Sequence, residues 1–234
     1  LKRRQLNADE WKKVKSAADS FGLAFFATIG YEEDLELVRS LNVHSIKIAS
    51  ADVNHFPLIR LAAKSGMCVQ LDTGNASLGE IEEAVDIIKK IGNDRIIIHQ
   101  CPSGYPARLP SINLRIIETL RQMFPYPVAY SDHTPGADMD IAAITLGANL
   151  VEKTITTDRS IKSVEHIFSL EPEDMTFFVQ RIRDLETAMG IGRRIMSKEE
   201  ISNRDLIRRS VFLTQDAKKG TLKLDPNKLA SLRK

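Results

Sequence analysis

The sequence predicts an α/β fold of the (β/α)8 (TIM) barrel type, from three observations. Six short runs of apolar, strand-forming residues recur along the chain, and each gap between them has room for a helix. Several runs are apolar on both faces, as expected of parallel strands covered by helices. No Gly-x-Gly-x-x-Gly turn, typical of a dinucleotide-binding sheet, follows any of them. The predicted strands are residues 23–28, 45–50, 68–73, 95–100, 127–132 and 150–155.

One helix between the strands has clear start and stop signals. Residues 77–92 open with Ser77 and Glu80, which are spaced as a capping box, and end at Gly92. The apolar residues of this segment recur at helical spacing and form one face, made of Ile81, Val85, Ile88 and Ile91.

Three further helices are predicted from similar signals. Residues 7–22 form a helix-like segment at the start of the chain, and a second helix begins near Ser111 and is stopped by Pro125. Residues 171–190 form a long amphipathic helix with acidic residues in its first turn and a glycine at its end.

The order of the elements also predicts the domain organisation. No strand and no initiator Met precede the first helix, so we expect that two leading βα units of the barrel are absent from this sequence. The barrel then occupies residues 1–190. A strongly charged linker is expected over 191–209, and residues 210–234 read as the beginning of a small second domain.

Composition excludes several classes of function. The 234 residues are 43% hydrophobic, enough to bury a core as one large or two small domains. With 33 basic and 31 acidic residues, the net charge of +2 gives no global attraction to nucleic acid or to an anionic membrane. No apolar run approaches a membrane span, and the basic start is not followed by a signal-peptide segment. Two unpaired cysteines fit a reducing compartment, so we expect a cytoplasmic location.

Polar residues gather where the predicted strands end. In a barrel the carboxyl ends of the strands meet at one face, where the chemistry takes place. The sequence therefore predicts a pocket at this face, formed from Thr28, Lys47, Ser50, Asp72, Thr73, His99, Gln100, Ser131, Asp132, His133, Glu152 and Lys153.

Lys47 is the most informative of these residues, because its neighbours Ile46 and Ile48 are apolar. Alternation along a strand would turn Lys47 to one side, and a desolvated ammonium inside the barrel needs an anion beside it. A substrate phosphate or carboxylate would supply one; a barrel Glu or Asp is the alternative. Hydroxyls of Ser50 and Ser131 could bind the same anion, or cap the helices that follow.

For three candidate side chains, a histidine and two glutamates, the sequence leaves more than one role open. His133 could be a metal ligand, a general acid or base, or a cap of the helix after Pro135. Glu152 and Lys153 are adjacent on a strand, so only one of them can point into the barrel. Glu165, on the loop after the last strand, could close over a ligand or remain solvated.

Four segments, in this order and spacing, resemble the sialic acid synthases (the N-acetylneuraminate synthase or NeuB/SpsE family) and their relatives that make pseudaminic and legionaminic acids or spore coat and other surface polysaccharides. They are "KIASADVNHFPLIRLAAKSGMCVQLDTGNASLGEIEEAV", "YSDHTPG", "TLGANLVEK" and "SLEPEDM". The likeness covers about residues 6 to 215. It implies a barrel followed by a small antifreeze-like (SAF) domain, in a domain-swapped homodimer.

The resemblance also implies a reaction. The family condenses phosphoenolpyruvate with an N-acylated mannose-type aldose, an N-acyl hexosamine, and releases phosphate, usually with Mn2+ or Mg2+. The chain is thus predicted to be a transferase that forms a C–C bond, with Lys47, Glu152 and His133 as its catalytic residues. The alternatives are another phosphoenolpyruvate-dependent, aldol-type sugar-acid synthase, and an inactive barrel that binds a sugar phosphate. Because the leading units of the family contribute further active-site residues, we expect the sequence as printed to be inactive alone.

The substrate-binding positions carry over residue by residue. Tyr105 matches a tyrosine near the sugar, and Glu165 matches the loop acid that contacts it. Two of the positions that match the phosphoenolpyruvate site differ from the family, because Asp72 replaces a serine of the usual "STG" and Ser103 replaces an asparagine or glutamate. The whole phosphoenolpyruvate set is Thr28, Lys47, Ser50, Asp72, Ser103 and Ser131.

The metal site is the main departure from the family. His133 matches one of two metal-binding histidines, but Thr154 stands where the second is expected. Asp72 could replace it, because a hard cation prefers carboxylate oxygen. Three interpretations stay open: a rearranged metal site formed by His133 and Asp72, a divergent substrate, and loss of activity.

Overall fold

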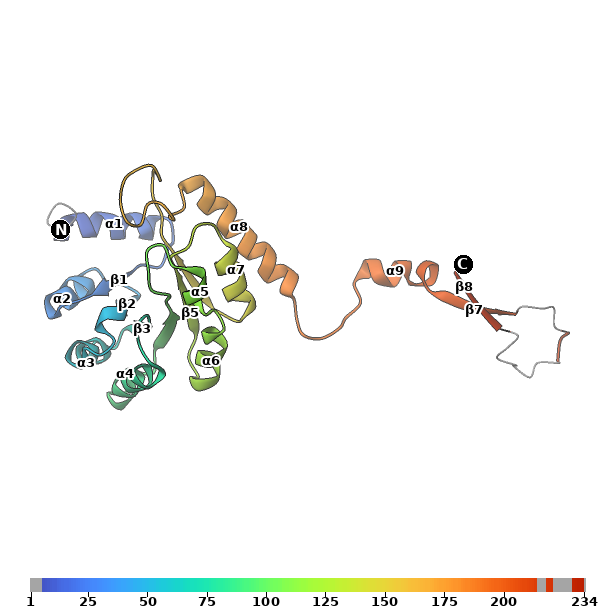
Figure 1. Ribbon diagram of the computed structural model, residues 1–234, viewed down its shortest axis with the longest axis horizontal. Coiled ribbons are helices and arrows are strands. Elements are labelled where there is room, and N and C mark those ends of the chain that lie inside the picture. Colours follow the sequence, from blue (N-terminus) through green and yellow to red (C-terminus); the bar gives the residue numbers. More distant parts are fainter. Residues whose placement is uncertain (1–5, 214–217, 221–228, 234) are drawn as a thin grey trace. The chain divides into compact units, whose positions relative to one another are not determined.

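Six parallel strands form the main sheet, in the order β1-β2-β3-β4-β5-β6 (Figure 1). Each strand overlaps one of the six predicted runs, so these predictions are confirmed. The order never reverses, which is the arrangement of a barrel and not of a doubly wound sheet. The strands are β1 (Phe26–Ile29), β2 (Ser45–Ile48), β3 (Cys68–Asp72), β4 (Ile96–Gln100), β5 (Val128–Asp132) and β6 (Leu150–Lys153).

A computed structural model of the chain describes residues 6–213, 218–220 and 229–233. The chain divides into two compact units, Leu1–Leu185 and Glu186–Lys234. No helix among the described residues is both long enough and apolar enough to span a membrane.

Most of the longer helices follow a strand along the chain and lie on the outer side of the curved sheet (Figure 1). Their bounds are α1 (Ala8–Ser20), α2 (Glu32–Ser40), the 3₁₀ helix η2 (Ser50–Asp52), α3 (Phe56–Lys64), α4 (Leu78–Lys90), α5 (Leu109–Ile112), α6 (Ile116–Met123), α7 (Asp138–Thr145) and α8 (Pro172–Met189).

Two of the predicted helices test how well local sequence signals predict where helices begin and end. The capping box of α4 is confirmed, since Ser77 and Glu80 bond each other's backbone N–H groups. The helix predicted from Ser111 to Pro125 is instead divided into α5 and α6. Asn113 lies between them with a φ of 47°, a left-handed conformation that asparagine adopts more readily than most residues and that ends α5.

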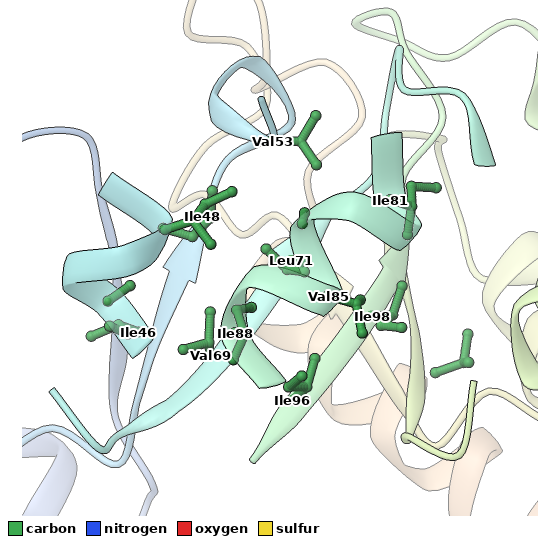
Figure 2. Packing of buried hydrophobic residues seen from close by; sticks show 14 of the residues in the cluster. Ile46, Ile48, Val53, Val69, Leu71, Ile81, Val85, Ile88, Ile96 and Ile98 are labelled. Carbon is green, nitrogen blue, oxygen red and sulfur yellow. The ribbon is translucent and has the colours of Figure 1, made fainter. Parts of the chain in front are cut away.

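The core lies between the sheet and its helices (Figure 2). Strands β2, β3 and β4 are in register, so that Ile46 lies beside Val69 and Val69 beside Ile96, with Ile48, Leu71 and Ile98 one step further on. Ile81, Val85 and Ile88 of α4 pack in the same cluster. Because strand residues alternate between two faces, the residues between these apolar ones point to the other face of the sheet.

The sheet is curled into a half-barrel. Strands β2 and β6 are four positions apart in the sheet, which is about 19 Å in a flat sheet and too far for two side chains to bridge. Yet Lys47 on β2 forms an ion pair with Glu152 on β6. The concave face of the sheet is therefore an interior, and polar side chains from distant strands meet there.

The second unit contains helix α9 (Lys198–Ile207) and an antiparallel hairpin of β7 (Arg209–Leu213) with β8 (Leu229–Arg233). Helix α9 lies within the segment 191–209 that the sequence predicts as a linker, and none of its residues is buried. The hairpin begins at Arg209, the last residue of the predicted linker, and otherwise lies within 210–234, the predicted start of an antifreeze-like domain. Of that segment, residues 214–217, 221–228 and 234 lie outside the described residues.

Candidate active site

Lys47 lies among the polar residues of the half-barrel interior. Its Nζ is 2.8 Å from Asp72 Oδ2 and 2.7 Å from Glu152 Oε1, and its side chain is only 5% exposed. Two carboxylates, from β3 and β6, therefore surround the ammonium. Of the two partners that the sequence left open, a barrel carboxylate is the one the structure contains.

The two carboxylates differ in their pKa although they share one lysine. Burial raises the pKa of Asp72 to about 6, and the charge of Lys47 offsets only part of this effect. The Glu152 side chain is 33% exposed against 10% for Asp72. Burial would raise the pKa of Glu152 as well, but Lys47 outweighs it and the pKa is lowered. Glu152 is thus ionised at neutral pH, while Asp72 changes protonation near pH 6.

A chain of buried polar groups lies behind Asp72. His99 Nε2 is 2.8 Å from Gln70 Oε1, and the Gln70 amide donates to Ser45 Oγ at 2.6 Å. His99 Nδ1 lies 3.6 Å from Asp72 Oδ1, and neither atom has a hydrogen-bond partner. Burial, together with the charge of Lys47, lowers the pKa of His99 to about 3, so its ring is neutral. Asp72 therefore gives one oxygen to Lys47 and leaves the other unpartnered.

Hydroxyls and a glycine complete this side of the site. Ser131 Oγ donates to Glu152 Oε1 at 2.9 Å, and the Gly74 N–H donates to Ser50 Oγ at 3.1 Å. A Cβ on Gly74 would lie 2.8 Å from Ser50 Oγ and 2.9 Å from the Cys101 carbonyl oxygen. Glycine thus allows the loop after β3 to approach the loops after β2 and β4. Burial raises the pKa of the Cys101 thiol to about 11, so it is no nucleophile at neutral pH.

A cavity of about 630 Å³ opens over these groups at the carboxyl ends of the strands. It brings together six of the residues that the sequence predicts for the site: Ser50, Asp72, Tyr105, His133, Glu152 and Glu165. It also brings in residues that the sequence argument did not assign to a substrate: Asn54, Asn75, Glu80, Cys101 and Thr154.

His133 and Tyr105 lie together in this cavity. Their ring centroids are 4.5 Å apart, and His133 Nδ1 lies 3.2 Å from the Pro102 carbonyl oxygen. A carbonyl only accepts, so Nδ1 carries the proton and the lone pair of Nε2 is left available. Burial lowers the pKa of His133, which keeps the ring neutral at neutral pH.

Four of the predicted phosphoenolpyruvate-binding residues do not line the cavity. Lys47 and Ser131 lie in the charge cluster beside it, and Thr28 and Ser103 lie elsewhere. Thr28 is in register with Lys47 and so faces the same side of the sheet, but it is exposed on the edge strand β1 and does not line the cavity. Ser103 lines a neighbouring cavity of about 500 Å³, where its hydroxyl donates to Asn75 Oδ1 at 2.8 Å.

A second buried charge cluster contains Asp132 and Lys153, so their predicted place in the pocket is wrong. Glu152 points inward and Lys153 points to the opposite face, as the alternation required. There Lys153 pairs with Asp132 and lies 3.1 Å from Asp140 Oδ2, with its side chain 2% exposed. Burial, and the nearby charge of Asp132, raise the pKa of Asp140 to about 7. No sequence spacing links Asp140 in α7 to Lys153 in β6; an aspartate in the apolar helix "DMDIAAIT" was the only signal.

The described residues of the cavity do not form a site for a divalent metal. Within the described part of the chain, no group of three or more His, Cys, Asp or Glu could hold a metal ion. His133 offers one nitrogen, one oxygen of Asp72 is held by Lys47, and Thr154 provides only a hydroxyl without a hydrogen-bond partner. Protein metal centres of this kind normally have three or more ligands.

Known proteins resemble the chain over most of its length. It is 35% identical over 224 residues to the N,N'-diacetyllegionaminic acid synthase of Legionella pneumophila, covering 94% of this chain and 63% of that protein. It is 30% identical over 219 residues to the human N-acetylneuraminate-9-phosphate synthase, covering 93% of this chain and 61% of that protein. The chain thus spans less than two thirds of the length of these relatives.

The fold agrees with this likeness. The crystal structure of an N-acetylneuraminic acid (sialic acid) synthetase from Leptospira borgpetersenii, in complex with citrate, superposes with a TM-score of 0.79 at 31% identity, covering 86% of this chain and 70% of that one. A sequence model of the NeuB family matches residues 1–194. Since that match takes in the whole sheet and the cavity residues, the chain belongs to the NeuB family, as its sequence motifs predicted.

Proposed function

We propose that this chain forms most of the barrel of a synthase in surface polysaccharide biosynthesis. The enzyme would condense phosphoenolpyruvate with an N-acyl mannosamine-like aldose and yield a nonulosonic acid and phosphate. Relatives named as synthases of legionaminic acid and of N-acetylneuraminate 9-phosphate support this product class. The observation that carries the proposal is the Lys47–Asp72–Glu152 cluster beneath a cavity at the carboxyl ends of the strands.

The chemistry requires a new C–C bond, a new C–O bond from water, and cleavage of the C–O bond to phosphate. C3 of phosphoenolpyruvate joins the aldehyde carbon, water adds at C2, and the bond from C2 to the phosphate oxygen breaks. Glu152 is ionised and lies at the cavity, so it is the group suited to accept a proton from that water. Lys47 and the Ser131 hydroxyl stabilise the negative charge of Glu152, and the hydroxyl of Ser50 lines the cavity.

The aldose would occupy the other side of the cavity. Tyr105 and His133 offer stacked ring faces there, and Glu165 can accept hydrogen bonds from sugar hydroxyls. These groups suit an uncharged, hydroxyl-rich ligand.

Replacement of Lys47 tests the proposal. In the full-length protein that contains this sequence, Lys47→Ala should raise the KM for phosphoenolpyruvate and lower kcat, measured as phosphate release. Lys90→Ala is the control, because Lys90 also pairs with an acid but is 76% exposed. An unchanged kcat/KM in Lys47→Ala, with the protein folded, removes Lys47 from the site and refutes the proposal.

A barrel that binds a sugar phosphate without turnover is the second candidate. Thr154 at the family's second histidine position, and the carboxylate of Asp72 at a phosphate-binding position, favour it. Phosphate release with a panel of N-acyl hexosamines separates the two functions, since binding without release would favour the second.

A further inference from the structure

Two charge clusters lie back to back on strands β5 and β6. The strands pair in register, so that Ser131 lies opposite Glu152, and one residue further on Asp132 lies opposite Lys153. Because successive side chains point to opposite faces of a sheet, the first pair faces the half-barrel interior and the second faces α7. Neither residue of the second pair lines the cavity, and the function proposed above gives them no role.

Asp132 holds the chain just after β5. Its carboxylate accepts hydrogen bonds from the Tyr130 hydroxyl at 2.9 Å, from the Thr134 hydroxyl at 2.9 Å and from the Thr134 N–H at 3.2 Å. All three residues are at most 3% exposed. The backbone at the end of the strand is therefore fixed to one buried carboxylate.

Lys153 holds the same segment from the neighbouring strand. Its ammonium pairs with Asp132 and donates to the Thr134 carbonyl oxygen at 2.7 Å. It also lies 3.1 Å from Asp140 Oδ2 of α7. Hydrogen bonds to an ionised group are stronger than those between neutral groups, and more so where water is excluded. Thr134 is thus bound through its N–H, its hydroxyl and its carbonyl.

His133 lies between the two residues that this cluster binds. Of the described residues 131–134, only His133 lines the cavity. Its carbonyl oxygen accepts from the Ala107 N–H at 2.9 Å, its Nδ1 lies 3.2 Å from the Pro102 carbonyl oxygen, and its ring contacts Tyr105. A side chain in a binding site keeps such contacts only when the groups behind it hold its backbone in place.

Stability alone is a weak reason to bury these charges. The side chains of Asp132, Asp140 and Lys153 are each at most 2% exposed. Removal of charges from water offsets most of their attraction, so apolar side chains of similar volume are often as stable in such a place. An apolar cluster, however, could neither accept from the Thr134 N–H nor donate to its carbonyl. What the charges add is therefore a fixed backbone after β5.

We propose that Lys153 is a positioning residue: by bridging Asp132 and the Thr134 carbonyl, it holds the ring of His133 on the aldose side of the cavity. Lys153 itself touches no substrate. The aldose depends on it through His133, whereas the groups proposed for phosphoenolpyruvate chemistry are held by the separate ion pair of Lys47 with Glu152. This inference rests on the proposed function for the identity of the ligand that His133 contacts.

A double variant removes the bridge. Lys153→Met with Asp140→Asn leaves Asp132 as the one acid of the cluster, still bonded by its hydroxyl and N–H donors. Asp140→Asn alone is the matched control, because it removes the same acid and leaves both contacts of Lys153 with the segment after β5.

Steady-state phosphate release by the full-length protein that contains this sequence is the measurement, with the N-acyl hexosamine that the parent protein converts fastest. The double variant should raise the KM for this aldose at least about tenfold and change the KM for phosphoenolpyruvate less than about twofold. The control should change neither KM by more than about twofold. Loss of folded protein lowers the rate at saturation but leaves KM unchanged, so the split between the two KM values separates positioning from stability.

Two outcomes overturn the inference and leave the proposed function standing. One is an unchanged KM for the aldose in the folded double variant. The other is an equal rise of both KM values, which would show a general distortion of β6. If the parent protein releases no phosphate with any aldose, the proposed function fails instead, and NMR of the His133 ring protons decides the inference. These resonances should move in the double variant and stay in place in the control; unmoved resonances in both would overturn it.

A milder variant covers the case in which the double variant does not fold. Thr134→Val removes a hydroxyl that donates to Asp132 but removes no charge, and it should raise the KM for the aldose at least about threefold. Thr145→Val is its control, since that hydroxyl donates to the Ile141 carbonyl oxygen at 2.8 Å on the exposed side of α7. Equal KM values for the aldose in these two variants would overturn the inference.

Discussion

Lys47 on β2 and Glu152 on β6 form an ion pair of 2.7 Å across the interior of the half-barrel. Asp72 on β3 lies on the other side of the same ammonium, at 2.8 Å. The cluster therefore joins strands that are far apart in the sheet. It holds two carboxylates, one buried and one partly exposed, against a single buried cation.

Removal of this cation should destabilise the fold. Lys47→Met leaves the buried Asp72 and the partly exposed Glu152 without their cation, and we expect a loss of about 3–5 kcal/mol in the free energy of unfolding. The triple variant Lys47→Met, Asp72→Asn, Glu152→Gln removes all three charges and should recover most of that loss. Urea denaturation measures both. A triple variant no more stable than the single one would show that packing of the lysine chain, and not charge, is what the cluster provides.

Asp140 should make stability depend on pH. Its pKa is about 7 in the folded chain against an ordinary 3.8, so between these values the folded state holds a proton that the unfolded state has lost. The contribution of Asp140 to the free energy of unfolding is fully present below about pH 4. It declines as the pH rises towards 7, by at most about 4 kcal/mol.

Asp140→Asn should abolish the part of this decline in the free energy of unfolding that Asp140 causes. Urea denaturation at pH 5 and pH 8 measures it. Asp138→Asn, at an exposed position of the same helix, is the control and should keep the parental pH dependence. If the two variants show the same difference between pH 5 and pH 8, the titration of Asp140 does not govern stability.

Gly74 should tolerate no side chain. A Cβ there would meet Ser50 Oγ and the Cys101 carbonyl within 3 Å, so Gly74→Ala should cost about 1–3 kcal/mol and displace the Ser50 hydroxyl. Gly79→Ala is the matched control, since no atom lies within 4 Å of a Cβ on that residue of α4. The control should be neutral or stabilising by up to about 1 kcal/mol. Equal melting temperatures for the two variants would contradict the close approach.

Sequence periodicity predicted which side chains of the strands face the interior of the half-barrel. The alternation of Ile46, Lys47 and Ile48 places the lysine opposite the core, and the same rule separates Glu152 from Lys153. These inferences succeed because a strand has a fixed period of two. Tyr105 and Glu165 lie on loops, where periodicity gives no prediction. The family resemblance pointed to Tyr105, and the position of Glu165 after the last strand pointed to that residue.

Contacts between distant elements could not be predicted in this way. The pairing of Lys153 with Asp140 depends on how α7 packs against β6, which no local pattern encodes. The break at Asn113 depends on one backbone angle in an otherwise helical segment. Thr28 was placed in the site because it ends a predicted strand, but its exposure depends on what adjoins the edge strand, which the local sequence does not specify.

The ring of Tyr105 should govern the protonation of His133. The two ring centroids are 4.5 Å apart, and burial is the cause that lowers the pKa of this histidine. Tyr105→Ala removes the covering ring, so water can reach the imidazole and the pKa should rise towards its ordinary value of 6.5. Tyr105→Phe keeps the ring and should leave the pKa unchanged. Titration of the His133 ring protons by NMR in EDTA measures both, and a pKa that is the same in the two variants would show that other groups desolvate His133.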